Sequence, residues 1–180
     1  MNNMINFSFL YIQIFFFICF LLFRIFSYLK TKKFNLKQEF LYFLMYINLA
    51  IVIRFVFFPR ALVDGKIQPL VFDSSKIFPI WFNLVPLKHL FDYDNLFDIL
   101  WNVLGNSLLF VPTGILLPIV NKKLNTFPKV ILSGATISLI IEILQLPFFD
   151  RASDIDDIIL NTVGVAVGYG IYKIFNSKNK

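Results

Sequence analysis

Five apolar stretches, each about as long as a bilayer is thick, constrain the fold of this sequence more than any other feature. A transmembrane helix needs about 20 residues, within a range of roughly 17–25. The stretches cover residues 7–29, 39–58, 99–120, 130–149 and 158–175. The chain has 180 residues and is 58% hydrophobic, and a soluble domain of this size could not bury so much apolar surface. We therefore predict an all-α, polytopic helical membrane protein with about five transmembrane helices.

The charges between these stretches predict the orientation of the chain. The first gap, the third gap and the C-terminal tail are rich in lysine, whereas the fourth gap is acidic. Basic loops of membrane proteins stay in the cytoplasm. We therefore expect the N-terminus, the second gap and the fourth gap outside, and the C-terminus in the cytoplasm. The N-terminus has no basic residue before the first stretch and no small-residue cleavage site after it, so we expect no cleavable signal peptide.

The second gap, 59–98, is about 40 residues long and rich in proline, which opposes a long regular helix. Its second half is too apolar for a solvated loop. Two interpretations fit this composition. One is a hairpin or short helix lying in the outer interface, with Trp81 and Trp101 as anchors at headgroup level. The other is a loop that packs on the outer end of the helix bundle.

Several other classes of function lack support in the composition. The formal charge of +6 comes mostly from the gap lysines, and no basic stripe or nucleic-acid-binding motif accompanies it, so we expect no nucleic-acid partner. Cys19 is the single cysteine and cannot form an intrachain disulfide. It is expected to face lipid or to pack within the bundle. His89 is the single histidine, and we interpret it as an interfacial residue rather than a metal ligand.

Six strongly polar residues lie inside the apolar stretches, where polar groups are costly and usually functional. They are Arg54, Asn102, Asn106, Glu142, Gln145 and Asn161. With the predicted orientation and a rise of about 1.5 Å per residue, all six fall within about 10 Å of the outer boundary. Because six polar groups lie at about the same depth, they indicate a site. We expect a water-accessible pocket that faces outward. The alternative is a structural ion pair supported by Asn and Gln hydrogen bonds.

Spacing places these residues on shared helix faces. Asn102 and Asn106 are four residues apart, and Glu142 and Gln145 are three apart, so each pair shares a face. A further stripe combines polar and small residues at helical spacing, and consists of Asp157, Asn161, Gly164 and Gly168. Its glycine end is expected to let another helix approach closely.

Two further expectations concern charge and helix continuity. Arg54 and Glu142 carry opposite charges at matching depth, so we expect them to pair. Pro112 and Gly114 are expected to break the third helix near mid-membrane, and its freed carbonyls would then need neighbouring groups or would line a cavity.

The acidic segment 150–157 is predicted to form the mouth of the site. Its carboxylates could hold a divalent ion, help a phosphate to bind through that ion, or act as a base. They could equally cap the fifth helix, since an Asp near a helix N-terminus is stabilising. A run of this type is weak evidence for a metal, so the sequence assigns neither metal nor cofactor.

Parts of this sequence resemble the VanZ-like family. The stretch 102–118, NVLGNSLLFVPTGILLP, is similar to the central motif of that family. The runs 142–145, 151–157 and 161–164 resemble its second signature, and Arg54 and the run 83–86 match two shorter features. The resemblance covers about 54–168. It implies a bacterial multi-pass protein of the cytoplasmic membrane, with 1–38 as a first helix and basic loop and 39–180 as the family domain. The family's namesake is associated with teicoplanin resistance.

These observations lead to one main hypothesis and two alternatives. The main hypothesis is an outward-facing intramembrane site that binds or modifies a polar envelope molecule, which we expect to be anionic, such as a lipid headgroup or a glycopeptide-related molecule. Glu142 and Asp157 are the candidate catalytic bases. The candidate ligand contacts are Arg54, Asn83, Asn102, Asn106, Gln145, Arg151, Asp154 and Asn161. The alternatives are a small proton-coupled transporter and a structural subunit of a membrane complex. The sequence leaves open whether the site is catalytic.

Overall fold

Five long helices make up most of the protein. Its structure is a computed structural model that describes residues 4–59, 62–78, 82–87, 95–149 and 151–177. The helices are α1 (Phe9–Thr31), α2 (Leu36–Phe57), α3 (Leu96–Val120), α4 (Phe127–Gln145) and α5 (Ile155–Ser177). All five are long and apolar enough to cross a membrane. The predicted fold class is therefore confirmed. The orientation of the termini and the division of the chain after residue 38 stay predictions.

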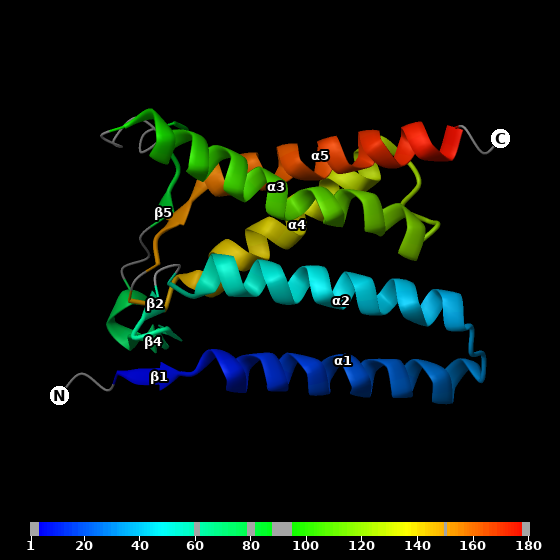
Figure 1. The fold of residues 1–180 in the computed structure, drawn as a ribbon, viewed down its shortest axis with the longest axis horizontal. Coiled ribbons are helices and arrows are strands. Elements are labelled where there is room, and N and C mark those ends of the chain that lie inside the picture. Colours follow the sequence, from blue (N-terminus) through cyan, green and yellow to red (C-terminus); the bar gives the residue numbers. More distant parts are fainter. Residues whose placement is uncertain (1–3, 60–61, 79–81, 88–94, 150, 178–180) are drawn as a thin grey trace.

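The helices run roughly along one axis, with short strands gathered at one end of the bundle (Figure 1). Helix α1 lies at the edge beside α2, and α2 contacts α3. None of the residues of α1 is buried, and Cys19 is exposed on it, as expected for a lipid-facing residue. A bidentate ion pair joins α1 to α2. Arg24 donates to both carboxylate oxygens of Glu39, at 2.8 and 2.6 Å.

The tightest helix contact joins α3 to α5, and glycines make it possible. A methyl group added at Gly164 would overlap the backbone carbonyl of Ser107, and one at Gly168 would overlap that of Val111. Gly114 on α3 is equally close to the backbone of Val165 on α5. The predicted role of the glycine stripe in a close helix approach is therefore confirmed.

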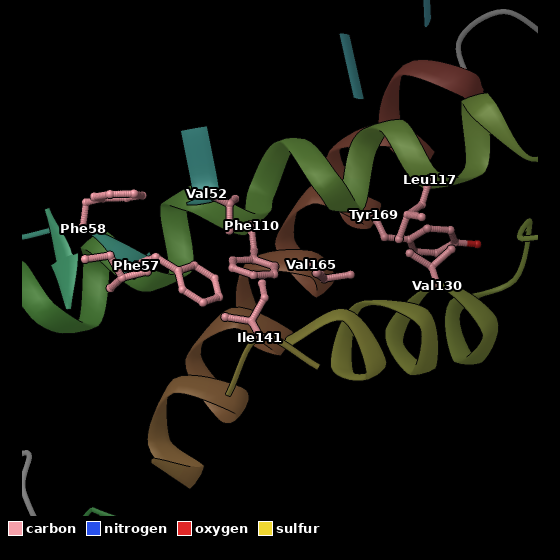
Figure 2. Close-up of a cluster of buried hydrophobic side chains, with 10 residues drawn as sticks. Val52, Phe57, Phe58, Phe110, Leu117, Val130, Ile141, Val165 and Tyr169 are labelled. Carbon is pink, nitrogen blue, oxygen red and sulfur yellow. The ribbon is translucent and has the colours of Figure 1, made fainter. Parts of the chain in front are cut away.

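The buried apolar core lies between α2, α3, α4 and α5 (Figure 2). Phe110 of α3 is fully buried near its centre, between Val52 of α2 and Val165 of α5. Ile141 of α4 lies on the other side of Phe110 from Val52, and Phe57 and Phe58 lie at the end of the cluster nearest the strands. Burial of one such side chain contributes roughly 1.5–3 kcal/mol relative to exposure in water, although less relative to lipid.

Helix α3 is continuous, so the predicted break at Pro112 and Gly114 is wrong. Side chains from α2 support the helix beside the proline. Asn48 donates to the carbonyl of Leu109 at 3.3 Å and accepts from the hydroxyl of Thr113 at 2.6 Å. The carbonyl that loses its helical donor at Pro112 is that of Leu108, so these bonds join α2 to α3 beside the proline and do not replace the missing bond. Both side chains of this Asn–Thr pair are buried.

The described residues of the second gap lie at one end of the bundle and include a hairpin (Figure 1). The hairpin joins β2 (Leu62–Val63) to β3 (Lys66–Ile67) through a turn in which Asp64 and Gly65 have φ of 50° and 69°. Positive φ at both positions is the geometry that Asp-Gly favours in a two-residue hairpin. Strand β4 (Leu70–Phe72) pairs antiparallel with β1 (Ile5–Phe7), which precedes α1.

A short 3₁₀ turn, Ser74–Lys76, fastens this segment to the α4–α5 connection. The ammonium of Lys76 donates to the carbonyls of Phe148, Phe149 and Arg151 at 2.7–2.8 Å. The Ser75 hydroxyl and N–H donate to Asp73 and hold the pKa of its carboxyl below the usual range. The predicted anchor Trp81, the histidine at 89 and the aspartate at 150 lie outside the described residues.

Candidate functional site: a polar pocket between the helices

A small polar cavity lies at the end of the helix bundle that carries the strands. Its volume is about 140 Å³. Helices α2, α3, α4 and α5 all contribute to its wall, together with the α4–α5 connection. The lining residues are Phe55, Val56, Asn102, Asn106, Glu142, Gln145, Arg151, Ala152, Asp157 and Asn161. Seven of the residues singled out in the sequence thus line one cavity, although they come from separate segments.

Helix α3 supplies two asparagines that are linked to each other and to α5. The Asn106 amide nitrogen donates to Asn102 Oδ1 at 3.0 Å and to Asp157 Oδ1 at 2.5 Å. Asn106 is buried, whereas Asn102 and Asp157 are half-buried. The spacing of four residues on α3 aligns the two amides, and the glycines of α5 bring Asp157 within their reach. Close helix packing and the polar wall are therefore parts of one arrangement.

Glu142 of α4 is fully buried. One carboxylate oxygen, Oε2, accepts from the backbone N–H of Asp154 at 3.1 Å. The backbone carbonyl of Glu142 accepts from the Ser153 hydroxyl at 2.6 Å. The other carboxylate oxygen, Oε1, has no hydrogen-bond donor. A buried carboxylate with one oxygen held and one unpartnered is costly for stability and suits a functional role.

Two amide side chains of the pocket also have one atom with a hydrogen-bond partner and one without. In both, the nitrogen has the partner and the oxygen has none. Gln145 donates to the carbonyl of Val56 at 2.8 Å, and Asn161 donates to the Ser138 hydroxyl at 2.9 Å. The amide oxygens of Gln145 and Asn161 are buried and accept from no donor. For Gln145 this orientation is fixed by chemistry, because the Val56 carbonyl can only accept and so requires the amide nitrogen. Three residues of the pocket lining thus each have a buried oxygen without a donor.

Arg54 lies outside the pocket lining, and the expected pair between Arg54 and Glu142 is not formed. Its guanidinium donates to the carbonyl of Pro59 at 3.1 Å and lies 5.8 Å from the ring centroid of Phe9 and 5.5 Å from that of Phe55. A carbonyl just beyond the end of its own helix satisfies the charge locally. The depth estimate placed Arg54 near the correct end of the bundle but could not give the direction of its side chain. Its contact with a ligand stays a prediction.

Asn83 and Asp154 contact each other instead of lining the cavity. They pair in the short parallel ladder of β5 (Phe82–Asn83) and β6 (Ser153–Asp154). The Asn83 amide donates to Asp154 Oδ2 at 2.9 Å, and Asp154 Oδ1 accepts from the N–H of Asp156 at 2.9 Å. The second bond caps the N-terminus of α5, which agrees with the capping interpretation for Asp154. Ligand contact by Asn83 or Asp154 stays a prediction.

The carboxylates of the acidic segment 150–157 therefore have different roles. Asp156 accepts from the N–H of Leu87 with both carboxylate oxygens, at 2.8 and 3.0 Å, and so binds the second gap at that residue. Asp157 alone among its described carboxylates lines the pocket. Within the described ranges, no group of three or more His, Cys, Asp or Glu side chains could hold a metal ion.

Sequence reasoning missed two serines that support the pocket. Ser138 is fully buried and accepts from Asn161, and Ser153 is buried against the backbone of Glu142. Ser138 lies four residues before Glu142, so helical spacing already placed it on the same face of α4. Ser153 carries no comparable signal, because its position depends on the turn between α4 and α5.

Comparisons with known proteins give the chain a family. A family model described as VanZ/LLP1 matches residues 43–176, which include every residue of the pocket. A curated relative, Protein VanZ of Enterococcus faecium, is 36% identical over 74 residues, which are 41% of this chain and 45% of that protein. The matched segment thus spans under half of the relative. No solved structure matches. The chain is a multi-pass membrane protein that belongs to the VanZ/LLP1 family.

Proposed function

We propose that this protein binds a small hydrogen-bond-donating group of an envelope molecule in the polar pocket. The observation that carries the proposal is the set of three buried acceptor oxygens without a donor, Glu142 Oε1, Gln145 Oε1 and Asn161 Oδ1. An unsatisfied buried polar group costs roughly 1–3 kcal/mol. Hydroxyl or ammonium groups of a ligand that donate to these atoms would remove this cost.

The size of the cavity limits what enters it. Pockets for drug-sized ligands measure about 300–1,000 Å³, whereas this one measures about 140 Å³. A headgroup fragment fits that volume, and a whole glycopeptide antibiotic does not. We therefore propose that the pocket holds one polar group of a larger molecule, such as an envelope lipid, whose remainder stays in the bilayer or in water.

The acceptor-rich wall changes the preferred chemistry of the ligand. The sequence suggested an anionic ligand held by Arg54, but that guanidinium is bound to the Pro59 carbonyl. Two carboxylates and one guanidinium, those of Glu142, Asp157 and Arg151, line the cavity. This balance favours a neutral polyol or an amine over a simple anion.

Of the two candidate bases, Glu142 is the better placed for proton transfer. Its Oε1 has no donor, whereas Asp157 Oδ1 accepts from Asn106. A general base must reach the proton that it removes. In this proposal Glu142 meets the donor group of the ligand, and Asp157 aligns the α3 amides.

The two alternatives receive less support. A transporter typically uses a broken helix at the membrane midplane, but α3 is continuous, and the pocket lies at one end of the bundle. A structural subunit would place its polar groups on an outer surface, yet Glu142, Gln145 and Asn161 are buried.

The binding proposal is tested by analysing the molecules that copurify with the protein. In Glu142→Gln, the new amide can still accept from the Asp154 N–H, which places a donor where Oε1 was. A donor ligand should then be lost from the mass spectrum of extracted small molecules, while the fold is kept. Asp64→Asn is the matched control, because Asp64 is exposed in a turn where Asn is also favoured. Equal recovery of the same molecules from all three proteins would contradict the proposal.

We further propose that the protein acts in the bacterial cytoplasmic membrane and contributes to teicoplanin resistance, by similarity to its family. The experiment expresses it in a susceptible bacterium and measures the inhibitory concentration of teicoplanin. Glu142→Gln and Asp157→Asn should reduce protection at unchanged protein level, whereas Asp64→Asn should retain it. No protection by the unaltered protein would end the resistance proposal and leave the binding proposal to the extraction experiment.

A further inference from the structure

A second cavity lies at the end of the bundle opposite the polar pocket. Its volume is about 800 Å³. Its lining residues come from the beginning of α2, the end of α3, the α3–α4 connection and the end of α5. These segments all lie at the end of the bundle away from the strands (Figure 1). Its lining residues are Lys37, Ile115, Pro118, Ile119, Lys122, Asn125, Tyr172, Lys173, Phe175 and Asn176. No function described above uses it.

Three cations from separate elements converge on this cavity. Lys37 belongs to the first turn of α2, Lys122 to the α3–α4 connection and Lys173 to α5. None of the described lining residues is acidic. The nearby carboxylate on α2, that of Glu39, is held by Arg24. Within the described part of the chain, the three ammonium groups therefore have no carboxylate partner.

Helix dipoles oppose an anion here only weakly. The C-terminal ends of α3 and α5 each carry about half a negative charge, against three full positive charges. On α3, two of the terminal carbonyls are also occupied. Gln38 donates to Val120 at 3.0 Å, and the N–H of Asn121 donates to Leu117 at 3.0 Å. We therefore expect a positive electrostatic potential in the cavity.

The rest of the wall suits the apolar part of an amphiphile. Ile115, Pro118 and Ile119 line one side from α3, and Tyr172 and Phe175 line another from α5. Long lysine side chains near helix ends place their charges at headgroup level. A cavity with cations at its rim and apolar walls between helices fits an anionic lipid better than it fits water alone.

We propose that this cavity binds a phosphate group, carried either by an anionic lipid or by a free phosphate compound. Lys37, Lys122 and Lys173 contact the phosphate oxygens. The apolar wall holds glycerol and the first part of the acyl chains when the source is a lipid. The site is independent of the polar pocket and of the function proposed for it.

Native mass spectrometry of the full chain in detergent tests the proposal, with titrations of phosphatidylglycerol, phosphatidylcholine and inorganic phosphate. The triple variant Lys37→Gln, Lys122→Gln, Lys173→Gln should bind phosphatidylglycerol at least about tenfold more weakly than the unaltered protein. The matched control carries the same charge change at the same end of the bundle but outside the cavity, as Lys33→Gln, Lys123→Gln, Lys129→Gln. It should stay within about twofold.

The titrations also distinguish the source of the phosphate. Binding of phosphatidylglycerol alone that is lost in the cavity variant would identify a lipid site. Binding of inorganic phosphate that is lost to the same extent in that variant would identify a site for free phosphate compounds. Equal losses in both triple variants would mean that net charge alone attracts the anion, which overturns the proposal. Phosphatidylcholine binding as tightly as phosphatidylglycerol, or no loss in the cavity variant, would overturn it as well.

Discussion

A methyl group at Gly168 should destabilise the protein, because this glycine lies directly against the backbone of α3. The added carbon of Gly168→Ala would overlap the Val111 carbonyl and lie 3.0 Å from the Gly114 Cα. Backbone atoms cannot rotate aside as a side chain can, so α3 and α5 must move apart.

The expected size follows from two opposing effects. Alanine gains about 1 kcal/mol over glycine in a helix, whereas overpacking of a tight interface costs typically 1–3 kcal/mol and sometimes more. Because the overlap is with backbone atoms, we expect a cost in the upper part of that range, about 2–3 kcal/mol, and hence a net loss of about 1–2 kcal/mol for Gly168→Ala. Gly170→Ala is the matched control, two residues along the same helix, where an added methyl group meets nothing within 4 Å. It should be neutral or stabilising by up to about 1 kcal/mol.

Equilibrium unfolding in mixed detergent micelles, followed by helical circular dichroism, measures both variants. The same interface positions Asp157 against Asn106, so Gly168→Ala should also weaken ligand recovery in the extraction experiment. Identical unfolding of Gly168→Ala and Gly170→Ala would refute the reasoning, because only the α3 backbone distinguishes the two positions.

Three further predictions follow from individual contacts. Thr113→Val should lower stability by about 0.6–2 kcal/mol in detergent unfolding, because it removes the donor to a buried asparagine of α2; an unchanged midpoint would contradict this. A double-mutant cycle with Arg54→Gln and Glu142→Gln should give a coupling energy near zero, and a coupling above about 1 kcal/mol would show that the two residues pair after all. In a cysteine-free background, an impermeant thiol reagent should label Ser74→Cys but not Lys33→Cys on intact cells, and the reverse pattern would invert the predicted orientation.

The sequence predicted the helices and the pocket residues well because both rest on simple periodicities. Apolar length located five helices, although α4 ends at Gln145, earlier than the expected 149. Helical spacing put Asn102 beside Asn106 and Glu142 beside Gln145, and depth arithmetic brought these faces to one end. The structure adds that all four residues line one cavity.

The remaining features depend on tertiary contacts that no local pattern contains. Pro112 predicted a break in α3, but the helix is continuous there, and Asn48 from another helix binds it beside the proline. Equal depth suggested that Arg54 pairs with Glu142. The guanidinium instead donates to the carbonyl of Pro59, which lies closer to it along the chain. Charge and depth give the position of a side chain along the membrane normal, whereas its direction depends on the packing around it.

We propose that the polar pocket is accessible to water and opens to the outer face of the membrane. The most direct test of this proposal compares two cysteines at nearly the same depth on α3, again in a cysteine-free background. Asn102 lines the pocket, whereas Leu104 is 52% exposed on the outer surface of the bundle and does not line it. A small impermeant thiol reagent added to intact cells should label Asn102→Cys and leave Leu104→Cys unlabelled, because a thiol in lipid stays protonated and unreactive. Absence of labelling at Asn102→Cys, or equal labelling at both positions, would contradict the account.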